Sequence, residues 1–99
     1  MTRITLACAA GMSTSLLVSK MNMAAIKENL SVKVQAVPEN DFEKYAGETD
    51  ILLLGPQVSY TLSKMKAQYE PMGIKVAVIN SVDYGMMNGE KVLKQALDL

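Results

Sequence analysis

The sequence predicts an α/β fold, in which residues 1–99 form one domain around a four-stranded parallel open sheet covered by helices on both faces. Four short apolar runs alternate along the chain with segments of helical periodicity, as they do in parallel sheets. The third run, at 50–55, is continuously apolar, which is typical of a parallel strand buried on both faces. The 99 residues, of which 49% are hydrophobic, suffice for one core.

The predicted strands are the four apolar runs. In chain order they are RITLAC (Arg3–Cys8), SVKVQAV (Ser31–Val37), DILLLG (Asp50–Gly55) and KVAVIN (Lys75–Asn80). The second run alternates apolar residues with Lys33 and Gln35, so we expect one of its faces to be wetter than the other.

The first predicted helix follows the first strand. Ser13 or Thr14 caps its start, and it continues to about Asn29. The residues that share its inner face are Leu17, Met21, Ala24 and Ala25.

Three further helical segments are predicted. ENDFEKYAGE holds a short helix that ends near Gly47, and Pro56 fits the first turn of a helix that runs to about Tyr69. SVDYGMMNGE is a loop with one helical turn. The last helix turns Val92, Leu93, Ala96 and Leu97 inward, and Lys91, Lys94, Gln95 and Asp98 outward.

Right-handed crossovers favour the strand order 2-1-3-4. In such sheets ligands bind beyond the carboxyl ends of the strands, at the switch point between strands 1 and 3. Cys8 ends the first strand, and GPQ (Gly55–Gln57) follows the third. We therefore expect Cys8 and GPQ to lie side by side.

Composition excludes several classes of function. Ten basic residues balance ten acidic ones, which gives no electrostatic reason to expect nucleic acid or an anionic membrane as a partner. No apolar run approaches the roughly 18 residues of a membrane span, and the N-terminus resembles a strand rather than a signal peptide. A single cysteine indicates a reducing cytoplasm. The absence of histidine removes imidazole dyads and metal sites, and we expect neither a metal nor a cofactor.

The segment after Cys8 is suited to holding a phosphoryl group. A loop that leaves a strand and enters a helix aims backbone N–H groups at one point, and the helix N-terminus adds partial positive charge. Both features stabilise a thiolate. The small residues and hydroxyls of the loop crowd an anion little and offer it donors. The alternative is that Cys8 is a small buried hydrophobe.

CAAGMSTSLLVSKM resembles the active-site segment of the enzyme IIB components of the bacterial phosphoenolpyruvate-dependent sugar phosphotransferase system, lactose/cellobiose/chitobiose family. DILLLGPQVSY (Asp50–Tyr60) and VINSVDYG (Val78–Gly85) resemble the same family, so the resemblance covers nearly the whole chain. It implies a four-stranded parallel sheet and a phosphoryl relay. A IIA partner phosphorylated on histidine donates to Cys8, which passes the group to a sugar held by the membrane partner IIC.

The resemblance also assigns residues. Cys8 is the phosphorylated nucleophile. The phosphate loop consists of Ala9, Ala10, Gly11, Met12, Ser13, Thr14 and Ser15. Because IIC lies in the membrane, the protein is expected in the cytoplasm, at the inner face of the membrane through IIC and without inserting itself. The sugar is expected to be a β-linked disaccharide.

A hydrolase is the main alternative. The fold is expected to resemble that of the low-molecular-weight tyrosine phosphatases. The loop also resembles theirs, whose signature is C-x5-R-[ST], but Thr14 stands where that signature has arginine. A guanidinium would clamp phosphoryl oxygens and stabilise the transition state. An arsenate reductase would need a second thiol, which is absent, and an FMN protein would need more stacking aromatics than four Tyr and one Phe.

Four further residues are candidates for the surroundings of the site. Gln57 either donates an amide hydrogen bond near the phosphate or is a surface residue. Tyr60 is either partner surface or an ordinary exposed tyrosine. Asp83 and Tyr84 follow the fourth strand on the site face, and Asp83 would be the general acid in a phosphatase or a turn residue in a relay.

Overall fold

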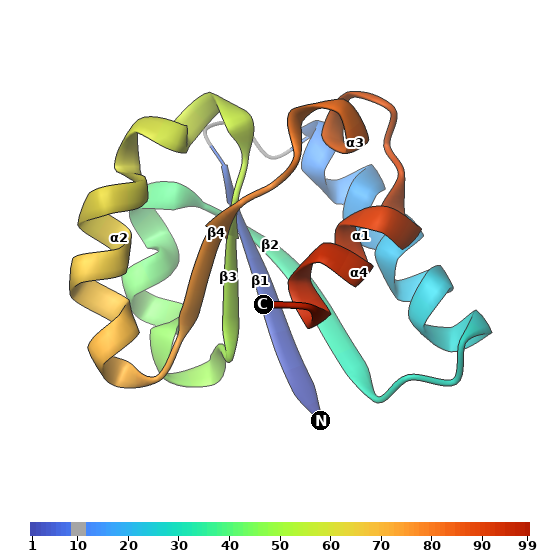
Figure 1. Ribbon diagram of the computed structural model, residues 1–99, viewed down its shortest axis with the longest axis horizontal. Coiled ribbons are helices and arrows are strands. Elements are labelled where there is room, and N and C mark those ends of the chain that lie inside the picture. Colours follow the sequence, from blue (N-terminus) through green and yellow to red (C-terminus); the bar gives the residue numbers. More distant parts are fainter. Residues whose placement is uncertain (9–11) are drawn as a thin grey trace.

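The computed structural model describes residues 1–8 and 12–99, with the side chains of residues 12–14 outside the description. Its parallel strands lie in the order β2-β1-β3-β4 (Figure 1), as predicted. Their bounds are Thr2–Cys8 for β1, Val32–Pro38 for β2, Ile51–Leu54 for β3 and Lys75–Val78 for β4. From β1 the chain adds β2 on one side and then β3 and β4 on the other side. The switch point, where the order of the strands reverses, therefore falls between β1 and β3.

Helices cover both faces of the sheet. On one face lie α1 (Met12–Lys27), α3 (Ser81–Gly85) and α4 (Gly89–Leu97). On the other lie η1 (Glu39–Glu48), η2 (Pro56–Thr61), α2 (Leu62–Tyr69) and η3 (Glu70–Met72). Successive strand residues serve the two layers alternately, so the sheet separates two apolar cores. β3 is buried at every position, as its unbroken apolar run predicts.

The strands end together at one edge of the sheet. Cys8 lies opposite Pro38, and Leu54 lies opposite both Ala7 and Val78. In parallel strands this shared register brings the loops that follow them to the same side. The segments that follow the four strands therefore start from the same end of the sheet, where the carboxyl ends of the strands lie.

Two predictions about the first and last helices are wrong. α1 begins at Met12, so the helix starts before Ser13 and Thr14, where its start was predicted. In α4, Leu97 is 37% exposed rather than buried, because it is the last residue of the helix and lies outside the buried core.

Gln95 was expected to face solvent, and it is instead half-buried. Its Nε2 donates to the carbonyl of Val78 at 2.9 Å, and its Oε1 accepts from the backbone N–H of Asn80 at 3.0 Å. β4 is an edge strand, and the amide bonds backbone groups at its end as a neighbouring strand would. Asn22 of α1 does the same at the other edge of the sheet, where it pairs with both backbone groups of Val34. Two amide side chains therefore occupy hydrogen-bonding groups on both edge strands.

Candidate functional site

Cys8 is the last residue of β1 and is only 1% exposed. The backbone around it is fixed by the neighbouring strand, because the N–H of Gly55 donates to the carbonyl of Ala7 at 2.9 Å. This bond continues the β1–β3 ladder by one residue and brings GPQ next to the cysteine. The expected neighbourhood of Cys8 and GPQ is confirmed.

Gly55 permits a close approach between the two strands. A Cβ at this position would lie 3.2 Å from Cys8 Cβ and 2.7 Å from Gln57 Oε1. The second distance is shorter than Cβ contacts allow, so any side chain here would displace the Gln57 amide or the cysteine. Gly55 was expected beside Cys8 as part of GPQ, but its role in this close approach was not predicted. The signal was present, since a glycine followed by proline at a strand end often marks a tight approach.

Gln57 and Tyr84 join the two layers across this edge. Gln57 is the second residue of η2, and its Nε2 donates to the hydroxyl oxygen of Tyr84 in α3 at 3.0 Å. Tyr84 is 8% exposed and belongs to the core under α1 and α4, whereas Gln57 is exposed. The hydrogen bond therefore ties an exposed amide to a buried phenol.

Asn80 fixes the position of α3. Its side chain accepts from the backbone N–H groups of Val82 at 2.9 Å and Asp83 at 3.2 Å, and so caps the helix. This cap sets where Tyr84 stands relative to β4. This cap was not predicted, although an asparagine directly before a short helical segment is a recognised capping signal.

The remaining predicted residues lie at the same edge or just beyond it. Tyr60 is 78% exposed, and Asp83 is half-buried in α3. Of the predicted phosphate loop, Ala9, Ala10 and Gly11 lie outside the described residues. Met12 to Ser15 form the first turn of α1, whose N-terminus thus follows Cys8 by four residues.

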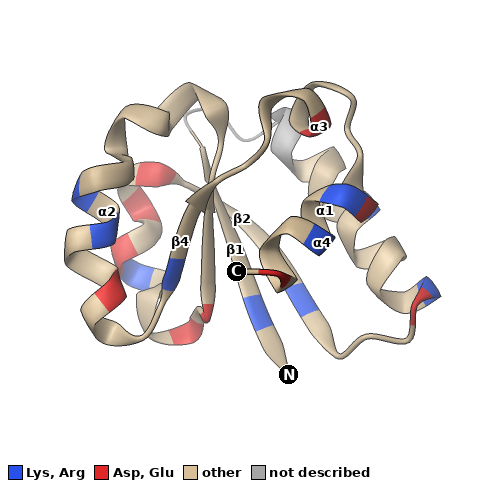
Figure 2. Cartoon of the chain, in the orientation of Figure 1, with Lys and Arg blue, Asp and Glu red and all other residues tan. Residues whose placement is uncertain are grey.

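This edge of the sheet is poor in cations. Neither lysine nor arginine occurs at residues 9–19, 39–43, 55–63 or 79–90, the segments that follow the four strands. Figure 2 accordingly shows no basic residue on α3 or on the turn from β3 into η2. Any anion held beside Cys8 by these segments must be held by neutral hydrogen-bond donors.

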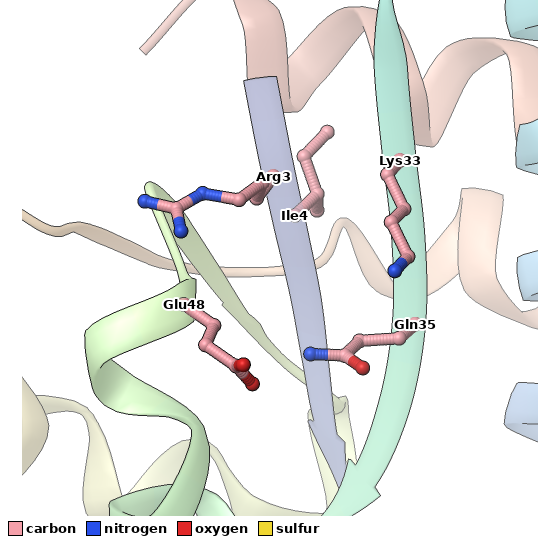
Figure 3. Close-up of a pocket in the computed structure, with 5 residues that line it drawn as sticks. All are labelled: Arg3, Ile4, Lys33, Gln35 and Glu48. Atoms are coloured by element: carbon pink, nitrogen blue, oxygen red, sulfur yellow. The ribbon is translucent and has the colours of Figure 1, made fainter. Parts of the chain in front are cut away.

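A separate pocket of about 160 Å³ lies at the other end of the sheet. Figure 3 shows Arg3 and Ile4 on β1, Lys33 and Gln35 on β2, and Glu48 reaching in from η1. It lies near the amino ends of these strands, opposite the end that carries Cys8, and its lining contains no thiol or hydroxyl side chain.

Arg3 is held by an ion pair beside this pocket. Its Nη2 donates to Asp50 Oδ1 at 3.1 Å, and its backbone N–H donates to Asp50 Oδ2 at 2.8 Å. The side-chain hydrogen bond from Arg3 holds the pKa of Asp50 below its usual range, helped by the backbone bond. The same side-chain bond raises the pKa of Arg3. A guanidinium so occupied is a poor ligand for a further anion.

The sequence matches the family model described as "PTS system, Lactose/Cellobiose specific IIB subunit" over residues 3–95. The chain belongs to this family. A galactose-specific EIIB component of Lactococcus lactis is 45% identical, covering 97% of this chain and 94% of its own. An oligo-beta-mannoside-specific EIIB component of Bacillus subtilis is 38% identical over the whole of this chain and 96% of that protein. This membership makes the chain a component of a sugar-transporting phosphotransferase system.

Solved structures agree with the IIB fold. The cellobiose-specific IIB component of Borrelia burgdorferi is 37% identical, with a TM-score of 0.79 over 98% of this chain and 89% of that one. YwlE of Bacillus subtilis, of the low-molecular-weight tyrosine phosphatase fold, has a TM-score of 0.64 at 14% identity, covering 96% of this chain and 95% of that one. The predicted likeness to the phosphatase fold is therefore confirmed at the level of the fold.

One relative is much longer than this IIB chain. A lactose-specific EIICB component of Lactococcus lactis is 31% identical over 84% of this chain, which matches 15% of that protein. Within residues 1–8 and 12–99 of the present chain, no helix has both the length and the apolar character needed to cross a membrane.

Proposed function

We propose that this IIB protein is a phosphoryl relay in which Cys8 carries the phosphoryl group. The observation that carries the proposal is the position of the only thiol in a chain without histidine. It stands at the carboxyl end of β1, at the switch point of the sheet, with a helix beginning four residues later. Membership of the IIB family supplies the setting of sugar uptake.

The relay has two transfers. In the first, the Cys8 thiolate attacks the phosphorus of a phosphohistidine on a IIA partner, and the electrons of the broken P–N bond return to the imidazole. In the second, a hydroxyl oxygen of a sugar bound by a membrane IIC partner attacks the phosphorus. The S–P bond then breaks, the sulfur leaves as a thiolate, and the hydroxyl proton passes to a base. Cys8 is thus regenerated.

The names of the relatives support the proposed partner and the proposed class of substrate. The name EIICB of one relative joins the IIC and IIB components in one protein, which supports a IIC partner for this chain. Relatives named for galactose, cellobiose and oligo-β-mannosides support a sugar, and we propose a β-linked disaccharide. Docking to IIC would place the protein in the cytoplasm at the inner face of the membrane.

Predicted phosphate ligands belong to this proposal as well. The loop from Ala9 to Ser15 would hold the phosphoryl oxygens, with backbone N–H groups and hydroxyls as donors. No lysine or arginine in that stretch competes for the role. An anion bound this way is stabilised without a positively charged clamp.

The test is mass spectrometry of the intact chain after incubation with phosphoenolpyruvate, the general relay proteins and a IIA protein of the family. We expect one added phosphoryl group on the wild type, located on Cys8 by fragmentation. Cys8→Ser should accept none while keeping the same far-ultraviolet circular dichroism. Undiminished phosphorylation of that variant would overturn the assignment, as would labelling of the wild type at another residue.

A further inference from the structure

The charge of a phosphoryl group on Cys8 has no side-chain cation to meet in the segments that follow the strands. A phosphate ester carries about two negative charges at neutral pH, whereas residues 9–19, 39–43, 55–63 and 79–90 contain neither lysine nor arginine. These segments must therefore stabilise the group with neutral donors. Side-chain amides at this edge become important for that reason.

Gln57 places an amide within reach of the cysteine. The point where Gly55 would carry a Cβ lies 2.7 Å from Gln57 Oε1 and 3.2 Å from Cys8 Cβ, so these two atoms are within about 6 Å of each other. Because residue 55 is glycine, it places no side chain between them. A sulfur atom and a phosphoryl group built outward from Cys8 Cβ span a comparable length.

Tyr84 gives this exposed amide a fixed position. A solvent-exposed glutamine ordinarily samples many rotamers and loses conformational entropy when it binds. Here the hydrogen bond from Nε2 to the Tyr84 hydroxyl at 3.0 Å restrains the amide before any ligand arrives. Tyr84 is itself held by the core and by the Asn80 cap of α3.

We propose that Gln57 is a ligand of the phosphoryl group on Cys8 and that Tyr84 is its positioning residue. This inference rests on the proposed role of Cys8. With Cys8 unmodified, Oε1 is the amide atom that lies next to the Cβ position of Gly55, while Nε2 donates to Tyr84. An oxygen in that place would repel phosphoryl oxygens, so the amide turns over when Cys8 becomes phosphorylated and presents Nε2 to the group.

The Tyr84 hydroxyl allows the Gln57 amide to rotate while the hydrogen bond between the two side chains is kept. A tyrosine hydroxyl can accept a hydrogen bond or donate one, whereas the two ends of a glutamine amide are a pure donor and a pure acceptor. Tyr84 therefore accepts from Nε2 when Cys8 is unmodified and donates to Oε1 when it is phosphorylated. Phenylalanine at position 84 could do neither.

The test measures the equilibrium of phosphoryl exchange between a phosphorylated IIA protein and this chain. Gln57→Glu keeps the side-chain shape but replaces the donor by a negative charge, and we expect the equilibrium constant to fall about tenfold to a hundredfold. Gln68→Glu makes the same charge change on the exposed face of α2 and should leave it unchanged. Tyr84→Phe should lower it several-fold, and Tyr45→Phe, in η1, should not.

A double variant separates positioning from a structural role. If Tyr84 acts through Gln57, Gln57→Glu with Tyr84→Phe should have an exchange equilibrium constant no lower than that of Gln57→Glu alone. The side-chain amide protons of Gln57, identified by their loss in Gln57→Glu, should also shift in the NMR spectrum when the wild type is phosphorylated, whereas those of Gln68 should not.

The outcomes are distinct for the two proposals. Equal exchange by Gln57→Glu and Gln68→Glu overturns the role of Gln57, and fully additive losses in the double variant overturn the role of Tyr84. In both cases a phosphorylated wild type leaves the relay standing. If the wild type takes up no phosphoryl group on Cys8, the relay and this inference fall together.

Discussion

The two ends of the parallel sheet hold different chemistry. Near the amino ends of β1 and β3 the side chains are charged and paired, with Arg3 bound to Asp50 and Glu48 close by. Near the carboxyl ends of the same strands lie a thiol, a glycine, an amide and a phenol. The charged end, which holds the pocket, lacks the thiol.

This difference bears on how a relay can work. A charged clamp would hold a phosphoryl group firmly and would also favour its attack by water. Neutral donors hold the group with less transition-state stabilisation, so it can wait for an acceptor. On this view the amino end supplies stability and the carboxyl end supplies chemistry. Four substitutions test that division, beginning with those at the carboxyl end.

Gly55→Ala should have the largest effect. The added methyl group would press on Cys8 Cβ and displace the Gln57 amide from Tyr84. We expect phosphoryl uptake to fall about tenfold or more and the free energy of unfolding to drop by about 1–3 kcal/mol. Uptake assays and urea unfolding measure these. Gly47→Ala is the control, since nothing lies within 4 Å of a Cβ there. Equal behaviour of both variants would contradict the close approach.

Thr14→Arg should sharpen the comparison by adding the missing cation. One hydrogen-bond donor in an oxyanion hole contributes roughly 2.7–4 kcal/mol, and we expect a smaller gain here because the loop is not shaped for a guanidinium. Phospho-Cys8 should then lose its phosphate to water faster and transfer less of it to sugar. The decay rate of the phosphorylated protein, with and without IIA and IIC, measures this.

The matched control for that variant is Thr14→Gln, which adds length without charge, so its phosphorylated form should decay more slowly than that of Thr14→Arg. A separate measurement, of aryl phosphate hydrolysis by the unmodified chain, tests the relay itself. If the unmodified chain alone hydrolyses aryl phosphates readily, the protein is a phosphatase, and the absence of arginine needs another explanation.

Thr49→Val should affect stability and leave the chemistry intact. Thr49 donates to the carbonyl of Tyr45 at 2.9 Å, so in its 2.7 Å contact with Thr5 the proton comes from Thr5. Valine keeps the volume but leaves this buried hydroxyl of Thr5 without its acceptor. We expect a loss of about 1–3 kcal/mol in urea unfolding and unchanged phosphoryl uptake. Reduced uptake at full occupancy of the folded state would break the division between the two ends.

Asp50→Asn should have the smallest effect. The lowered pKa of Asp50 means that its ion pair stabilises the fold above the ordinary aspartate pKa of about 3.9, and that this contribution is lost as the pH falls through the lowered value. Both partners are more than 40% exposed, so the contribution is small. Thermal unfolding should differ slightly between the wild type and Asp50→Asn at pH 7 and converge in acid. A difference that persists in acid would point to a cause other than the charge.

The sequence by itself determined the layers, the strand order and the position of the cysteine. Those follow from strong local signals: the unbroken apolar run at 51–54, the alternation in β2 and the small-residue loop after Cys8. Right-handed crossovers then leave few ways to arrange four parallel strands. The neighbourhood of Cys8 and GPQ needed only that topology, because register brings the ends of adjacent strands together.

Only the tertiary structure decided which polar side chains do specific work. Gln57 and Tyr84 are 27 residues apart and Gln95 lies 17 residues from Val78, so no local pattern shows that these groups meet. The start of α1 at Met12, ahead of two good capping residues, likewise differs from what the local capping signal predicts. Periodicity reports which face of a segment is apolar, whereas the partner of a single amide depends on distances that arise only when the layers pack.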